Sequence, residues 1–168
     1  MKKDLTIILG LVLVIVGLLI FGKGYTSPSF FQTDKSPTSK SFGNQLMPLS
    51  VKSLVIRAEV ADNSKERKKG LSKRESLAIG EGMLFVFDKK QKYEIWMKDM
   101  QFPIDIIWID ENKKIVDIAE SVAIEPGRDD EELKIWRPRS EAIFILEINA
   151  GLVELHGLAI GDGVVFAL

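Results

Sequence analysis

The hydrophobic and polar positions divide the 168-residue chain into three stretches of different character. Leu5–Gly22 contains no charge and consists of apolar residues, glycines and one threonine. Residues 23–50 are dominated by Ser, Thr, Pro, Lys, Gln and Asn. From Val51 onwards short apolar runs alternate with polar turns, as in a folded domain. We therefore predict an N-terminal segment (1–22), a flexible linker (23–50) and a globular domain (51–168).

The apolar run at residues 5–22 has the length of a membrane-spanning helix. About 18 residues at ~1.5 Å each give roughly 27 Å, close to the ~30 Å of a bilayer's hydrocarbon core. Lys2 and Lys3 precede the run and Lys23 alone follows it directly, which favours a cytoplasmic N-terminus. We predict a single-pass anchor in the cell membrane, with the C-terminal domain outside the cytoplasm. A cleaved signal segment is the alternative, although its apolar core is usually shorter and no small-residue cleavage site follows Phe21.

The globular stretch reads as about seven strands and two or three short helices, which predicts a mainly β domain, a barrel or a sandwich. Asn63 and Asn149 are predicted to cap helices that end at Gly70 and Gly157. A second short turn is expected between Ser72 and Gly80. Further strands are expected at 51–61, 83–87, 114–124, 142–148 and 164–167.

The stretch Tyr93–Asp110 is predicted to be the centre of this domain. It contains two β-rich runs joined by a corner at Pro103, and apolar residues occupy both faces. A strand pair that is apolar on both faces must be covered on both faces. A four-residue connection would place Lys98 opposite Asp105, whereas a five-residue connection would send Lys98 to the other face.

Composition excludes several kinds of site. The net charge of −1 and the scattered lysines argue against nucleic-acid binding. The chain has no cysteine and one histidine, so a thiolate nucleophile or a site of several imidazoles cannot form. We expect no cofactor and no metal. Met83, Met97 and Met100 are read as core filling rather than as copper ligands.

Several charged residues lie among apolar neighbours and are candidates for a site. Asp105 and Glu147 interrupt apolar strands, and a buried carboxylate must be paired or become neutral. Together with Arg67 and Lys98, these two carboxylates are predicted to form one of two arrangements. The first is a cleft suited to acid–base catalysis or to ligand binding, and the second is a buried network of ion pairs. Trp96 either stacks on a sugar ring or, as its apolar neighbours favour, fills the core.

Five motifs occur in order along the chain: Arg67-x-x-Gly-Leu-x-x-Arg74, Gly82-Met-Leu-Phe-x-Phe87, Ile95-Trp-Met-Lys98 with Phe102-Pro-Ile-Asp-Ile-Ile107, Leu146-Glu-x-x-Ala-Gly151, and Ile160-Gly-Asp-x-Val164. Together they resemble domain-of-unknown-function family 192, also called uncharacterised protein family 0127. The resemblance covers roughly residues 51–168 and implies a compact, mainly β fold, often with a signal or anchor segment, and no established activity. Asp99-Met100 stands where the family usually has Asn-Thr, which removes two polar groups.

These observations favour a non-enzymatic binding or scaffolding module at the cell envelope. Its partners would be the membrane, through residues 5–22, and a small-molecule or glycan ligand. The candidate ligand-binding residues are Arg67, Trp96, Lys98, Asp105 and Glu147. One alternative is a small envelope hydrolase with Asp105 and Glu147 as catalytic carboxylates and Lys98 or Arg67 as stabiliser. Another is a purely structural domain without a ligand.

Overall fold

The computed structural model describes residues 46–168. The predicted membrane segment (1–22) and the linker up to residue 45 lie outside the described residues. Within residues 46–168, no helix combines the length and the apolar character needed to cross a membrane.

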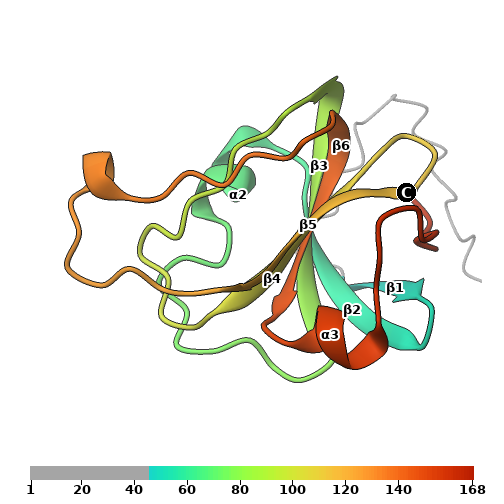
Figure 1. Ribbon diagram of the computed structural model, residues 1–168, viewed down its shortest axis with the longest axis horizontal. Coiled ribbons are helices and arrows are strands. Elements are labelled where there is room, and N and C mark those ends of the chain that lie inside the picture. Colours follow the sequence, from blue (N-terminus) through green and yellow to red (C-terminus); the bar gives the residue numbers. More distant parts are fainter. Residues whose placement is uncertain (1–45) are drawn as a thin grey trace, which may run out of the picture. The chain divides into compact units, whose positions relative to one another are not determined.

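Six strands form one mixed sheet in the order β1-β2-β3-β6-β4-β5, in which only β2 and β3 are parallel neighbours (Figure 1). Two short α-helices and one 3₁₀ turn complete the described elements, so the prediction of a mainly β domain with two or three short helices is confirmed. The elements are β1 (Leu46–Val51), β2 (Leu54–Ala61), α2 (Ser64–Lys69), β3 (Glu81–Gln91), β4 (Ile104–Ile109), β5 (Ile115–Val122), η1 (Asp130–Glu132), β6 (Ala142–Asn149) and α3 (Leu152–His156).

The sheet is open, so the predicted closed barrel or two-sheet sandwich does not form in the described residues. The edge strands β1 and β5 do not pair with each other. The C-terminal segment crosses the gap instead, because Val165 exchanges backbone hydrogen bonds of 3.0 and 2.8 Å with Ser50 in β1. Val164 donates to the carbonyl of Lys113, just before β5. The predicted strand at 164–167 therefore exists only as isolated bridges to both edges.

The first strand begins at Leu46, so residues 46–50 of the predicted linker belong to the folded domain. Met47 and Leu49 alternate as buried residues with exposed neighbours, which is the pattern of a half-buried strand. Pro48 obscured this pattern, but an edge strand tolerates proline because one side of its backbone needs no partner.

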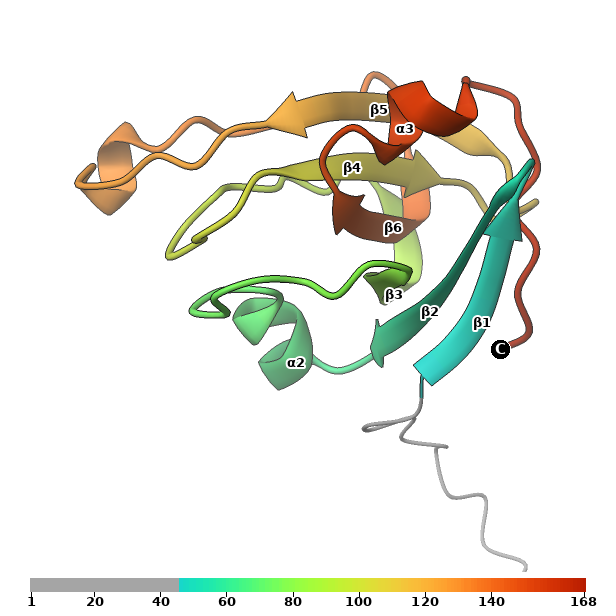
Figure 2. The ribbon, with the colours of Figure 1, turned by 90° about the horizontal axis from the view of Figure 1, so that it is seen from below.

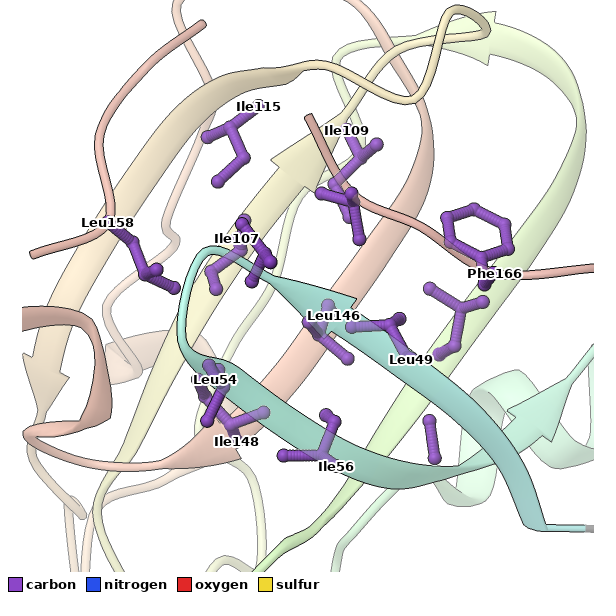
Figure 3. Packing of buried hydrophobic residues seen from close by; sticks show 14 of the residues in the cluster. Leu49, Leu54, Ile56, Ile107, Ile109, Ile115, Leu146, Ile148, Leu158 and Phe166 are labelled. Atoms are coloured by element: carbon purple, nitrogen blue, oxygen red, sulfur yellow. The ribbon is translucent and has the colours of Figure 1, made fainter. Parts of the chain in front are cut away.

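Both faces of the sheet are buried, each by its own hydrophobic cluster. One cluster contains Ile107, Leu146 and Ile148 and includes Val153 of α3 (Figure 3). The other contains Ile106, Ile145 and Leu71, the residue that follows α2 and Gly70. We call these the α3 face and the α2 face; Figure 2 shows the two helices on opposite sides of the sheet. Because neighbouring residues of a strand point to opposite faces, adjacent positions of β4 and β6 alternate between the two clusters.

The prediction for the central stretch is confirmed for one run and wrong for the other. All six residues of β4 are buried, as expected for a strand covered on both faces. The run at 93–98 is not its hairpin partner, because β4 pairs with β5 and β6. Residues 93–98 carry only a single bridge, between Ile95 and Trp136.

The two α-helices begin or end at three of the four capping residues that were predicted. The Asn63 side chain accepts a hydrogen bond of 3.0 Å from the Glu66 amide, and α2 ends at Gly70 as predicted. Gly157 ends α3, also as predicted. Asn149 does not cap α3, because its amide group donates to the Leu77 carbonyl at 3.1 Å and the cap is Gly151. Residues 72–80 form turns and irregular chain, where a second short turn was expected.

Candidate functional site

A pocket of about 730 Å³ opens on the α2 face of the domain. Four parts of the chain that are distant in sequence line it: α2 with the turn after it, the middle of β3, residues 93–100, and one residue of β6. We call residues 93–100 the wall segment. The lining residues are Arg67, Lys68, Lys69, Gly70, Leu71, Ser72, Lys73, Phe85, Phe87, Tyr93, Glu94, Ile95, Trp96, Lys98, Asp99, Met100 and Glu147.

Arg67 attaches α2 to β3 beside the pocket. Its Nη1 atom donates to the carbonyl oxygens of Asp62 at 2.6 Å and Val86 at 2.8 Å. The guanidinium also lies over the Phe87 ring, 5.2 Å from its centre, and Phe87 stacks on Tyr93 with ring centres 3.6 Å apart. Arg67 therefore builds an aromatic wall of the pocket, and two of its hydrogen bonds are used within the protein.

The wall segment is held in place by the core and by the connection between β5 and β6. Buried Trp108 donates through its indole N–H to the Tyr93 carbonyl at 3.0 Å. Ile95 and Trp136 exchange two backbone hydrogen bonds of 2.9 and 2.8 Å. The β5–β6 connection, which extends away from the sheet in Figure 2, also supplies the partner for Lys98, whose ammonium pairs with Asp130. These contacts fix the segment without regular secondary structure.

Trp96 is not a core residue, contrary to the expectation from its apolar neighbours. It is 56% exposed and lines the pocket, while the adjacent Met97 is buried in the cluster of the α2 face. Of the neighbouring side chains of Trp96 and Met97, it is Met97 that points into the hydrophobic cluster. The alternative prediction, that the Trp96 ring is available for stacking on a ligand, fits this position.

Glu147 lies at the sheet side of the pocket, in the middle of β6. Its strand neighbours are Met83 of β3 and Ile106 of β4, both buried and apolar. The side chain is 5% exposed, and burial raises the pKa of its carboxyl group to about 8. No residue within 46–168 forms a hydrogen bond or an ion pair with this carboxyl group. Glu147 is therefore a neutral acid at pH 7, with unused hydrogen-bonding capacity that faces the pocket.

Asp105 is also buried, but it belongs to the α3 face. Asp105 pairs with Ile148 while Glu147 pairs with Ile106, so the two acidic side chains point to opposite faces of the sheet. The Asp105 carboxylate accepts from the amides of Ser121 at 2.7 Å and Val153 at 2.8 Å. The predicted carboxylate pair of Asp105 and Glu147 is thus not assembled, and neither is a Lys98–Asp105 pair. Asp105 instead links a bulge of β5 to the first turn of α3.

Four of the five predicted ligand-binding residues line this one pocket: Arg67, Trp96, Lys98 and Glu147. The sequence pattern does not single out Phe87 and Tyr93, which look like core residues. Lys68 and Lys69 are also absent from the predicted site, because a basic run on a short helix is most simply a solvated face. The structure leaves both lysines exposed, and they line the pocket as well, so no local signal separates the two roles.

Charge and shape together decide what the pocket can hold. Five lining residues are basic and three are acidic, and one of the acidic residues is the neutral Glu147. Lys68 and Lys69 form no ion pair within the described part of the chain, whereas Lys73 pairs with Asp99 at 3.7 Å. No group of three or more His, Asp or Glu side chains suited to a metal is present in residues 46–168. The arrangement is suited to an anion with an apolar or ring-shaped body.

Comparison with known proteins identifies relatives of the domain. The family model "DUF192: Uncharacterized ACR, COG1430" matches residues 47–166. The chain is similar to a crystal structure of a proposed transcription regulator from Sinorhizobium meliloti 1021, with 28% identity, a TM-score of 0.63, and coverage of 71% of this chain and 91% of that one. It is also similar to a protein of unknown function from Novosphingobium aromaticivorans DSM 12444, with 27% identity, a TM-score of 0.65, and coverage of 77% and 89%. No curated protein matches the sequence.

Proposed function

We propose that this chain, which belongs to the DUF192 family, is a binding protein whose pocket takes a small molecule with an anionic group and an apolar or ring-shaped body. The observation that carries the proposal is the composition of the pocket, where a cationic rim adjoins an aromatic wall. We define the rim as Lys68, Lys69, Lys73 and Lys98.

The rim attracts anions because the lining residues carry more positive than negative charges, even though Lys98 pairs with Asp130 and Lys73 with Asp99. With Glu147 neutral, the lining residues carry five positive charges against two negative ones, from Glu94 and Asp99. Charges of one sign in a concave site raise the local concentration of ligands of the opposite sign. The exposed ammonium groups of Lys68 and Lys69 are the first contacts that we assign to the ligand's anion.

The aromatic wall binds the body of the ligand. Phe87, Tyr93 and the half-exposed Trp96 line the pocket with aromatic rings, of which Phe87 and Tyr93 already stack on each other. Flat rings of a ligand can stack on such surfaces, and so can the apolar face of a sugar. A glycan fits this pocket when it carries an acidic sugar, since the rim favours a negative charge.

Three matched naphthalene probes test the preference for anions: 2-naphthoate, the neutral 2-naphthamide and the cationic 2-naphthylmethylammonium. Binding to the full chain is followed by calorimetry and by quenching of tryptophan fluorescence. We expect the carboxylate to bind at least roughly tenfold more tightly than the amide, since a cationic site adds about 1–2 kcal/mol for an anion, and the cation to bind weakest. Equal affinities for the three probes would contradict the proposal.

Two controls locate the binding. The double variant Lys68→Ala, Lys69→Ala should reduce the difference between carboxylate and amide, while Lys89→Ala with Lys92→Ala, two exposed lysines outside the pocket lining, should leave it unchanged. D-glucuronate tests the glycan as a source of the same chemistry. A Trp96→Ala change should weaken both naphthoate and glucuronate if the ring supplies the stacking surface.

We further propose that residues 5–22 anchor the protein in the cell membrane and that the β domain lies outside the cytoplasm. The uncharged run and the two lysines before it support this orientation. Because the chain has no cysteine, single cysteines can be placed and labelled with a membrane-impermeant maleimide. Ile79 is 97% exposed, and Ile79→Cys should be labelled in intact cells.

Asp4→Cys is the matched control for this orientation, because it keeps Lys2 and Lys3. It should be labelled only after lysis, since it precedes the anchor on the cytoplasmic side. Labelling of Ile79→Cys only after lysis would contradict the orientation. A chain in which the Asp4→Cys label is absent even after lysis would show that the N-terminal segment is cleaved.

A further inference from the structure

Among the three acidic residues that line the pocket, Glu147 is the one without an ion pair in the described part of the chain, since Glu94 pairs with Arg137 and Asp99 with Lys73. A buried polar group normally has a hydrogen-bond partner, because its desolvation otherwise remains uncompensated. Within the described residues the carboxyl group of Glu147 has none, although its backbone pairs with β3 and β4 as in any central strand. The side chain is more than nine-tenths buried and it lines the pocket. Its free hydrogen-bonding capacity is therefore directed at whatever occupies the pocket.

The surroundings of Glu147 determine its role toward a ligand. Met83 and Ile106, its partners across the strands, supply neither a cation nor a hydrogen-bond donor. Arg67 lines the same pocket and donates through Nη1 to the carbonyls of Asp62 and Val86, and within residues 46–168 it forms no ion pair with Glu147. The acid therefore keeps its proton, and a carboxylic acid has one O–H donor. The four lysines of the rim repel cations, so a ligand with an ammonium group is disfavoured in this pocket.

We propose that Glu147 is the specificity-determining residue of the pocket, where its carboxylic acid donates a hydrogen bond to a neutral oxygen acceptor on the body of the bound anion. The ligand class thus becomes narrower: an oxo-acid or acyl-type molecule, with an anionic group at the rim and a carbonyl oxygen near the sheet. This inference rests on the proposed function, because it assumes that the anion occupies the rim.

Three ligands that differ only in a ketone test the inference. The parent is 5-phenylpentanoate, and the two others are 4-oxo-5-phenylpentanoate and 5-oxo-5-phenylpentanoate. All three have the same anion and the same ring, so the rim and the aromatic wall treat them alike. At pH 6.5 we expect at least one keto acid to bind the full chain roughly tenfold more tightly than the parent, the contribution of one buried hydrogen bond.

Two variants assign this preference to Glu147. Glu147→Gln retains an N–H donor and should keep the keto preference within about threefold, since a donor is what the carbonyl requires. Glu147→Met has a similar size and no donor, and it should bind the parent and the keto acids with equal affinity. The ratio is measured within one variant, so a change in stability does not affect it.

The outcomes separate this inference from the proposed function. Equal binding of all three acids by the unmodified chain overturns the role of Glu147 and leaves the anion-binding pocket intact. A keto preference that persists in Glu147→Met also overturns it. Failure of all three acids to bind contradicts the proposed function, and the inference falls with it.

Discussion

Asp105 and Glu147 are two buried acidic residues on neighbouring strands, one on each face of the sheet. On the α3 face, Asp105 is fully buried and accepts two backbone amides, from Ser121 and Val153. On the α2 face, Glu147 is nearly as buried, lacks a partner among the described residues, and lies against a pocket. Burial of an acid therefore does not identify a site. The distinction lies in whether the protein itself satisfies the carboxyl group.

The two acids also differ in what they do for the fold. Asp105 supplies acceptors to the buried amide of Val153 and the part-buried amide of Ser121, so it stabilises the start of α3 and the bulge of β5. Glu147 has no such function, and ionisation in the unfolded chain makes its burial unfavourable at neutral pH. Residues at functional sites commonly lower the stability of a protein. The unfavourable burial of Glu147 is therefore a further reason to assign it to ligand recognition.

The largest expected effect is the pH dependence that Glu147 imposes on stability. Its pKa is about 8 in the folded chain against 4.5 as the ordinary value. Below pH 4.5 both states are protonated; as pH rises to about 8 only the unfolded state loses the proton, so stability falls over this window and then levels. Glu147→Gln should therefore be more stable than the unmodified chain by about 4 kcal/mol at pH 8, and equal within about 1 kcal/mol at pH 4.5.

Urea denaturation of the full chain at several pH values measures this difference. The comparison of variant and unmodified chain removes the contributions of all other titrating groups. A difference that stays constant between pH 4.5 and 8 would contradict the burial of an unpartnered acid at this position.

The same change of carboxyl to amide at Asp105 should have the opposite sign. The side-chain amide introduced by Asp105→Asn would accept from one backbone amide and point its own N–H₂ at the other, leaving a buried donor facing a donor. We expect Asp105→Asn to destabilise the chain by about 3 kcal/mol at pH 7, measured by the same denaturation. Equal stabilities of the two amide variants at pH 7 would remove the distinction between the two faces.

The smallest expected effect concerns the rim. Lys98 pairs with Asp130 across the surface, and both side chains are substantially exposed. Such pairs contribute at most about 1 kcal/mol, so Lys98→Ala should change stability by less than about 0.5 kcal/mol. It should nevertheless weaken naphthoate binding, because Lys98 belongs to the cationic rim. A large loss of stability without a change in affinity would assign Lys98 to the fold and not to the ligand.

Local signals in the sequence were sufficient for several elements. The apolar run of β4 indicated a strand covered on both faces, and Asn63 and Gly70 marked both ends of α2. Gly157 marked the end of α3 because a residue tolerant of a positive φ suits that position. These features depend on residues that are close together in the chain.

Other features depend on pairings between distant residues, and a single sequence does not contain them. The assignment of Asp105 and Glu147 to opposite faces follows from the register of β4 against β6, which joins Asp105 to Ile148. The predicted hairpin does not form because both neighbours of β4 are other strands, β5 and β6, and the chain turns at residues 98–99, where Asp99 has a φ of 56°. The criterion of charged residues among apolar ones selected three pocket residues, Arg67, Lys98 and Glu147, and it also selected Asp105. A ligand site and a structural acid both meet this criterion.

The C-terminal segment forms one bridge to Ser50 in β1 and another to Lys114 just before β5. These bridges have a consequence for biosynthesis. They join residues from the two ends of the domain, and contacts of such long range form late in folding. As the chain leaves the ribosome, β1 and β2 can pair at once, but the outer edge of β1 has no partner until the last residues emerge. An unpaired edge can recruit a strand from another chain. Until the C-terminal segment arrives, this open edge therefore leaves the nascent chain exposed to aggregation.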